Sequence, residues 1–223
     1  MRGLGAAFLL VLSACAPNEE PTRPDILPTD FALLPCGLQE SDVPCAMAVI
    51  GGKRLLFGAP AGIGSTLDQS DLRMLDGVFL FSLRASDIEG LDEVRNESWR
   101  AGRSKPLPVA GPDGTAQTLS ALNLAFETGD ALRIVDEGVP PGGFDAAVLV
   151  QMGDESGADN PMFDTGDVLV RSEVRADQAV RYLVSYRGAD PVIIEPCLAG
   201  ECSFAGGQTW PLLDVHFIVK QTP

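Results

Sequence analysis

Several stretches of the chain carry the apolar patterns of β-strands. Some are short runs of strand-forming apolar residues, and others alternate apolar and polar side chains, as half-buried strands do. The runs cover residues 78–81 and 146–150, and the alternating segments cover residues 168–174 and 180–186. Residues 45–57, CAMAVIGGKRLLF, place two apolar runs on either side of Gly51-Gly52, which predicts a β-hairpin.

Two segments predict helices. Residues 93–103, EVRNESWRAGR, are polar and predict a helix followed by a loop. Residues 116–126 predict a second helix, because Leu119, Leu122 and Phe126 recur along one face of it. Thr115 directly precedes this helix and belongs to a residue type that caps helix N-termini, so we expect it to be the cap.

The N-terminus has the pattern of an exported protein. Residues 1–14 hold an apolar run too short to span a bilayer, and we expect them to be a signal peptide outside the folded domain. The run ends in Leu12-Ser13-Ala14-Cys15, which resembles the lipobox of bacterial lipoproteins. In that family cleavage precedes the cysteine, so Cys15 would carry the lipid. An ordinary secretory signal with a chance cysteine is the alternative.

A proline-rich segment follows the lipid-carrying cysteine. Residues 15–30 contain Pro17, Pro21, Pro24 and Pro28, which disfavour a helix and favour an extended tether. Ala16 stands where an Asp usually retains lipoproteins in the inner membrane, which favours the outer membrane, facing the periplasm. Residues 31–223 are long enough for one domain with a full core.

The chain is strongly acidic. Its 16 Lys and Arg oppose 31 Asp and Glu, giving a net charge of −15, and loss of residues 1–14 would remove one more basic residue. Such a surface repels nucleic acid and anionic lipid head groups, so no nucleic-acid partner is expected. The acidic residues between positions 153 and 167 do not follow the EF-hand spacing, which favours a solvated loop over a calcium site.

Four cysteines remain if Cys15 is lipidated. An even number in an exported chain favours disulfides over free thiols. Four cysteines allow three pairings, and the short spacings favour pairing in chain order, Cys36 with Cys45 and Cys197 with Cys202. A four-cysteine zinc site is less favoured, because the gaps differ from those of such sites and the periplasm is oxidising.

The polar turn after the predicted strand at 78–81 leads to Gly90-Leu91. A strand, a polar turn and a Gly-Leu pair that opens a helix resemble the metal-binding centre of the metallo-β-lactamase superfamily. That family writes the turn as T-H-x-H-x-D-H, followed by x-x-G-L. Here Phe81 stands at the Thr position, and the ligand positions hold Ser82, Arg84, Ser86 and Asp87.

Other segments extend the resemblance. Residues 50–57 are similar to the family's V-G-G-x-R-L-L-F, but Gly58 replaces the Asp that follows it. Residues 102–114 resemble G-R-x-x-P-L-x-V-Y-G-P-x-G, which narrows the likeness to the ribonuclease Z-like branch. Later matches are looser: the family's bridging Asp falls on Cys197, and a V-H-E motif keeps only His216.

The resemblance implies an α/β fold, the αββα sandwich of two mixed sheets flanked by helices, truncated at its C-terminus. It also implies a lost metal centre. A two-zinc hydrolase of this type needs about five His and two Asp ligands, whereas this chain has one His. We therefore expect no metal and no other cofactor. Because Cys36 and Cys197 both border the cleft in relatives, a Cys36–Cys197 bridge is the family-based alternative pairing.

Two interpretations concern the chemistry of this turn. Ser82 or Ser86 could form a hydrolytic triad with His216 and Asp87, although the chain contains no G-x-S-x-G nucleophile elbow. Arg84 could hold an anion or a carboxylate, but we expect it to form a structural ion pair with Asp87 instead.

The sequence therefore predicts a lipid-anchored cell-envelope protein with a degenerate metallo-β-lactamase-like fold. The expected role is non-catalytic: binding an unidentified small ligand in the former active-site cleft, or scaffolding with another envelope protein. The alternative is an ester or phosphodiester hydrolase that retains activity through other residues. In either case the membrane is contacted through the lipid anchor.

Overall fold

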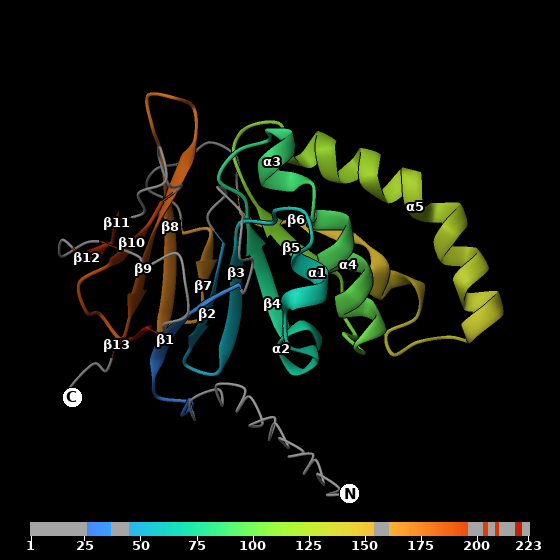
Figure 1. Ribbon diagram of the computed structural model, residues 1–223, viewed down its shortest axis with the longest axis horizontal. Coiled ribbons are helices and arrows are strands. Elements are labelled where there is room, and N and C mark those ends of the chain that lie inside the picture. The colour runs from blue at the N-terminus through green and yellow to red at the C-terminus, as the bar shows by residue number, and fades with distance from the viewer. Residues whose placement is uncertain are drawn as a thin grey trace, which may run out of the picture.

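The computed structural model describes residues 26–36, 45–153 and 161–195, together with the backbone of three short strands at 203–204, 208–209 and 217–219. Two β-sheets lie face to face, and the described helices cover the outer face of the larger sheet (Figure 1). The α/β fold with two sheets and flanking helices is the one predicted from the sequence.

The larger sheet is mixed and has the strand order β13-β1-β2-β3-β4-β5-β6. Its first strands pair antiparallel, whereas β3, β4, β5 and β6 pair parallel. The strands are β1 (Phe31–Pro35), β2 (Ala46–Ile50), β3 (Lys53–Phe57), β4 (Leu75–Phe79), β5 (Leu107–Ala110), β6 (Leu149–Gln151) and β13 (Phe217–Val219). The β2–β3 hairpin is confirmed, and its turn residues Gly51 and Gly52 have φ of 55° and 77°, as such a turn requires.

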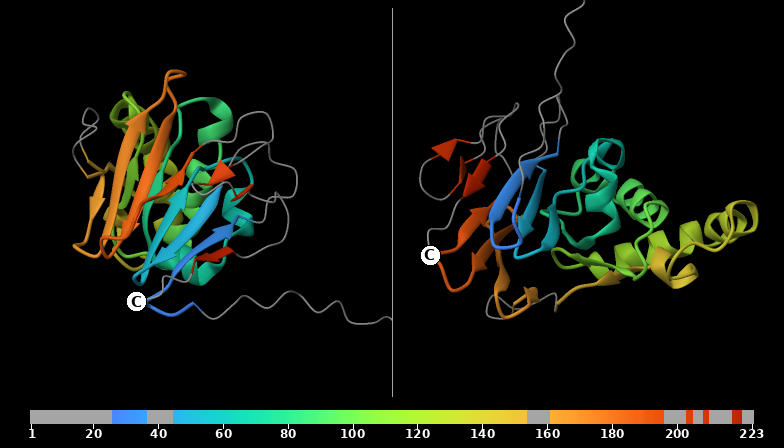
Figure 2. Two further views of the ribbon diagram at one scale, coloured as in Figure 1. Left: turned by 90° about the vertical axis from the view of Figure 1, so that its left-hand side faces the viewer. Right: turned by 90° about the horizontal axis from the view of Figure 1, so that it is seen from below.

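Helices connect the parallel strands, because parallel neighbours cannot be joined by a tight turn. They are α1 (Ile63–Thr66), α2 (Gln69–Arg73), α3 (Ala85–Ile88), α4 (Leu91–Arg100), α5 (Thr115–Glu137) and the 3-10 helix η1 (Phe144–Ala147). Their apolar side chains pack on one face of the larger sheet, with Ile63, Leu72, Leu91 and Leu119 all buried there. Figure 2 shows the same layering from two further directions.

The second sheet has the order β10-β9-β8-β7. Its strands are β7 (Phe163–Asp164), β8 (Val168–Val174), β9 (Val180–Tyr186) and β10 (Val192–Ile194). Two further short strands, β11 (Ser203–Phe204) and β12 (Gln208–Thr209), pair with each other in a separate sheet. The expectation of two mixed sheets is wrong for the β10-β9-β8-β7 sheet, because every described pair in it is antiparallel. Consecutive strands joined by short turns can only pair in this direction.

Aromatic side chains fill the space between the two sheets. The rings of Phe57 and Phe79 stack with centroids 4.7 Å apart, and Tyr182 from the second sheet meets the Phe79 ring edge-on at 5.2 Å. All three are fully buried, together with Phe31 and Phe81. These rings hold the second sheet against the larger one.

The structure corrects the predicted bounds and cap of one helix and the predicted start of one strand. The helix expected at 116–126 extends from Thr115 to Glu137, and its N-cap is Gly114 with φ of 94°. Thr115 does not cap it, since its hydroxyl donates a hydrogen bond to the Pro112 carbonyl at 2.6 Å. The strand expected at 146–150 begins later, because Ala146 and Ala147 belong to η1 and pack against buried Trp99.

A buried ion pair fixes the middle of α5 against α4. Arg95 and Asp130 are only 1% and 4% exposed, and Arg95 Nη1 lies 3.1 Å from Asp130 Oδ1. Arg133 of α5 lies over the Trp99 ring of α4, with its guanidinium carbon 4.5 Å from the ring centre. None of the described helices is long and apolar enough to span a membrane.

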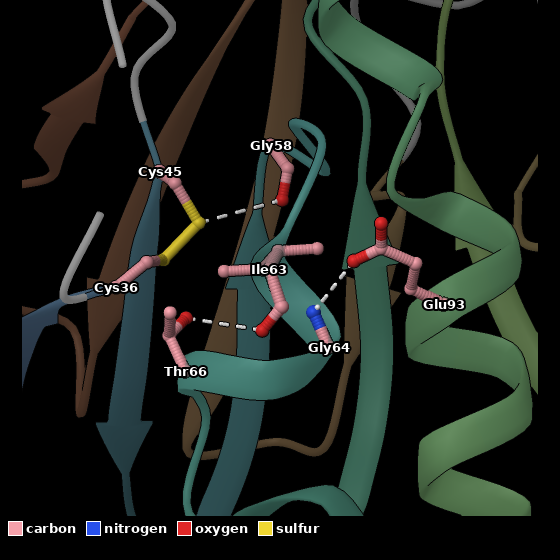
Figure 3. The surroundings of a disulfide bond; sticks show 7 residues. All are labelled: Cys36, Cys45, Gly58, Ile63, Gly64, Thr66 and Glu93. Atoms are coloured by element: carbon pink, nitrogen blue, oxygen red, sulfur yellow. Dashed lines mark hydrogen bonds between the residues drawn. A yellow bond between two sulfur atoms is a disulfide. The ribbon is translucent and has the colours of Figure 1, made fainter. Parts of the chain in front are cut away.

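A disulfide joins Cys36 to Cys45, with their Cα atoms 5.6 Å apart (Figure 3). The β1–β2 register pairs Pro35 with Ala46, so the two cysteines are the next opposed pair along this ladder. Cys45 Sγ also lies 3.7 Å from the Gly58 carbonyl oxygen, which we regard as a van der Waals contact because a disulfide sulfur carries no proton. Cys197 and Cys202 lie outside the described residues, so their expected pairing stays a prediction.

Candidate functional site

The loops that follow the parallel strands meet at one edge of the larger sheet. In α/β sheets, ligands bind outside the carboxyl ends of the strands. At this edge lie the segment after β4, the segment between β5 and α5, and the Cys36–Cys45 disulfide. The turn between β8 and β9 of the second sheet reaches the same edge, and Figure 1 shows this orange turn level with α3.

The segment directly after β4 is fixed by both sheets. Leu80 N donates to the Ala110 carbonyl at 2.8 Å, and Val180 N of β9 donates to the Phe81 carbonyl at 2.7 Å. The Tyr182 hydroxyl donates to the Leu80 carbonyl at 2.6 Å in a fully buried position. Burial raises the pKa of Tyr182 well above its ordinary value, so the phenol remains a hydrogen-bond donor.

Ser82 and Asp87 form a closed hydrogen-bond network on this segment. The two side chains are 7% and 9% exposed, and the Ser82 hydroxyl donates to Asp87 Oδ2. Ser82 Oγ also accepts a bond from the Arg84 backbone N–H at 3.1 Å, and the Ser86 hydroxyl lies 3.5 Å from Asp87 Oδ1. The side chains of Ser82, Ser86 and Asp87, at three of the four positions that hold ligands in the family, are thus bonded to one another. We call this network, with Leu80, Phe81 and Tyr182, the floor.

The expected ion pair between Arg84 and Asp87 is wrong. Asp87 is turned inward to the two serines, whereas Arg84 is exposed and its guanidinium has no ion-pair partner among the described residues. The reason is local geometry: the Arg84 backbone N–H is bonded to Ser82, and Arg84 is the N-cap residue of α3 with an extended backbone. Its side chain therefore leaves the floor toward solvent.

A cleft of about 330 Å³ opens above the floor. It is lined by Ser82, Leu83 and Arg84 from the floor side, Pro112 and Asp113 before α5, and Val174, Asp177 and Gln178 at the β8–β9 turn. Arg175 fastens this turn, with Nη1 2.7 Å from Glu195 Oε2 and Nε 3.5 Å from Asp177 Oδ1. The cleft walls therefore come from three separate chain segments that are each held in place.

Two acidic residues on the cleft walls were not among the predicted site residues. Asp113 is exposed and makes no contact with a described side chain that would neutralise it. Asp177 Oδ1 accepts a bond from Ala179 N at 3.1 Å, and this bond, followed by the nearby Arg175, lowers the pKa of the Asp177 carboxyl. We call Arg84, Asp113 and Asp177 the rim.

The fold family implies a metal centre, but the donors at this edge do not fit one. The candidate positions supply two hydroxyls, one carboxylate and a guanidinium, and the carboxylate oxygens are engaged by the serines. Zinc requires imidazole, thiolate or carboxylate ligands, which serine and arginine do not replace. Across the described ranges, no three His, Cys, Asp or Glu side chains are grouped so that they could hold a metal ion.

Two members of the possible serine triad, Ser82 and Asp87, lie together in the structure. Ser82 and Asp87 are bonded directly, without an imidazole between them, and Ser86 is exposed beside them. His216, the third member, lies outside the described residues, as do the acidic positions 154–160 of the candidate calcium loop. Among the described residues, each of these two serines therefore has the Asp87 carboxylate beside it and no imidazole.

No protein-family model matches the sequence, and no curated protein matches it. Solved structures do: the chain is similar to the metallo-β-lactamase fold protein YhfI from Bacillus subtilis, with a TM-score of 0.51 and 13% identity over 74% of this chain. It is also similar to the short form of human tRNase Z, with a TM-score of 0.47 and 16% identity, covering 78% of this chain and 70% of that one. The chain spans 61% of the length of YhfI. At such identities the likeness shows the fold alone, which is the metallo-β-lactamase fold.

Proposed function

We propose that this protein is a lipid-anchored component of the bacterial cell envelope whose cleft binds a small molecule without transforming it. The observation that carries this proposal is the Arg84 guanidinium, which has no ion-pair partner among the described residues and lines a cleft at the edge of the sheet where ligands bind in α/β folds. A charged donor without a described partner is available to a ligand at no cost in broken protein contacts.

The floor supports a non-catalytic role. Ser82 is nearly buried, donates to Asp87 and accepts from the Arg84 backbone, so both its proton and a lone pair are engaged. An attacking hydroxyl would also need open access to a substrate, and Ser82 is only 7% exposed. Holding the turn in place is the role that this geometry supports. Scaffolding of another envelope protein would use the same exposed rim.

The anchor and its location follow from residues 1–30, with Cys15 as the lipid-bearing residue and residues 16–30 as a tether. Acylation at Cys15 would hold the acidic domain at a membrane surface, and several acyl chains make such an anchor stable. Replacing Cys15 with Ser should move the protein out of the membrane fraction. Unchanged membrane association and acylation of that variant would contradict the anchor.

The binding role is tested by nuclear magnetic resonance of the ¹⁵N-labelled protein, titrated with a library of small charged compounds. We expect hits that shift the amide signals of Leu83, Arg84 and Asp113, and we expect Arg84→Gln to weaken them. A matched control is Arg171→Gln, which removes the same charge from an exposed position on β8 outside the cleft. If no compound perturbs the cleft signals, the binding proposal fails.

Catalysis is tested in parallel with generic ester and phosphodiester substrates, with and without a chelator. We expect no turnover above background, and a thermal melt that EDTA leaves unchanged. Turnover that depends on Ser82, or stoichiometric transition metal together with a chelator-induced loss of stability, would make the hydrolase alternative the better account.

A further inference from the structure

The cleft carries charges of both signs on different walls. Arg84 rises from the floor side, Asp113 lies before α5, and Asp177 lies on the β8–β9 turn. The Asp177 carboxylate accepts a hydrogen bond from Ala179 N and lies 3.5 Å from Arg175 Nε, both through Oδ1. Although all three residues line one cleft, Arg84 pairs with neither carboxylate among the described residues. A ligand that carries both a positive and a negative group can therefore contact Arg84 and the two carboxylates together.

The net charge of the whole chain favours some classes of ligand over others. With a net charge of −15, the protein repels anions at long range, and the two rim carboxylates would oppose a doubly charged phosphate at short range. A simple cation is attracted at long range but meets Arg84 in the cleft. A molecule with one positive and one negative group has no net charge, so it avoids the long-range repulsion and can satisfy both kinds of rim group.

Shape and polarity narrow the ligand further. The volume of about 330 Å³ lies at the small end of ligand pockets, which run from about 300 to 1,000 Å³. Leu83, Pro112 and Val174 add apolar surface beside the charges. Val174 is 67% exposed, and an apolar side chain of the ligand would cover part of it.

We propose that the cleft binds a small zwitterion, an aliphatic amino acid or an amine-carboxylate of similar size. Its carboxylate pairs with the Arg84 guanidinium, its ammonium group lies at Asp113 and Asp177, and its aliphatic part contacts Leu83 and Val174. This inference rests on the proposed binding function of the cleft and specifies its ligand class.

Three probes of matched shape test the proposal on the ¹⁵N-labelled protein. L-Leucine carries both charges, 4-methylpentanoate lacks the ammonium group, and 3-methylbutylamine lacks the carboxylate. We expect leucine to shift the cleft signals and the two single-charge probes to bind at least about tenfold more weakly, since each loses a charge-assisted contact. We expect Arg84→Gln to weaken leucine binding by about fivefold or more, and Asp113→Asn and Asp177→Asn by about two- to fivefold each.

Control variants, and the results that would contradict the inference, distinguish a failure of the zwitterion inference from a failure of the proposed binding function. Arg171→Gln and Asp136→Asn remove single charges from exposed positions outside the cleft and should leave leucine binding unchanged. If 4-methylpentanoate binds as tightly as leucine and still requires Arg84, the cleft is an anion site: the zwitterion inference is overturned while the binding function stands. If neither these probes nor any library compound perturbs the cleft, both proposals fail.

Discussion

The floor and the rim of the cleft adjoin at Ser82 and Arg84, and they differ in exposure and in hydrogen bonding. In the floor, Ser82, Asp87 and Tyr182 are buried and their polar groups are bonded within the protein. On the rim, Arg84 and Asp113 are exposed and carry charges without described partners. The floor side chains stabilise the protein, whereas Arg84 and Asp113 contribute little to stability and can contact a ligand.

The aromatic packing behind the floor should give the largest effect. Phe79 ends β4 and is fully buried between Phe57 and Tyr182. We expect Phe79→Ala to lower the free energy of unfolding by about 3–5 kcal/mol, because it removes buried apolar surface and leaves a cavity. Urea denaturation followed by circular dichroism measures it. A loss below about 1 kcal/mol would mean that the two sheets are not packed tightly behind the floor.

The disulfide beside the floor comes next. It closes a loop with a sequence separation of nine between Cys36 and Cys45. Cross-linking a loop of this length restricts the unfolded chain, and we expect the double replacement Cys36→Ser, Cys45→Ser to cost about 2–3 kcal/mol. The comparison is made under non-reducing conditions, and adding a reductant to the unmutated protein should cause at least this loss, because it would also reduce the predicted Cys197–Cys202 bridge. Disulfide mapping that finds Cys36 joined to Cys197 would contradict the pairing itself.

Tyr182→Phe tests the floor with a smaller change. The phenol donates to the Leu80 carbonyl in a buried position, and the ring contacts three other aromatic side chains. Phenylalanine keeps the ring and removes only the donor, leaving a buried carbonyl without that bond. We expect a loss of about 1–2 kcal/mol in the free energy of unfolding. No measurable loss would show that water or another donor replaces the phenol, and the floor would then be less closed than described.

Local sequence patterns predicted the strands and the turn that carries the floor. Gly51-Gly52 marked the β2–β3 hairpin, and alternation marked β8 and β9 over the residues that the structure shows. The Gly-Leu pair that supported the family resemblance also has a physical reason. A side chain at Gly90 would place its Cβ 2.0 Å from the Pro60 carbonyl oxygen, so only glycine fits there.

The features that the sequence did not predict depend on contacts that form only in the folded protein. Asp177 joins the cleft only because the second sheet packs over β4, and nothing in its own turn signals this. The Asp87 carboxylate accepts a hydrogen bond from the Ser82 hydroxyl instead of pairing with the Arg84 guanidinium. The sequence does not indicate which of these two neighbours it contacts. The helix α5 continues past Phe126 and through Gly129, because buried Asp130 holds that stretch against Arg95 of α4.

The smallest expected changes in the free energy of unfolding come from replacing the rim residues Arg84 and Asp113. The sign of each change tests whether these residues have partners in the folded protein. Arg84 and Asp113 make no described ion pairs, so replacing either should change the free energy of unfolding by no more than about 0.5 kcal/mol. In a chain with a net charge of −15, Arg84→Gln increases the self-repulsion and should destabilise slightly, whereas Asp113→Asn decreases it and should stabilise slightly. Both differences should shrink as salt is raised, because exposed charges are screened. Parallel thermal melts of the two variants at low and high ionic strength measure this. If Arg84→Gln costs as much as Tyr182→Phe, and the cost persists in high salt, then Arg84 has a structural partner in the folded protein, and its availability to a ligand would have to be given up.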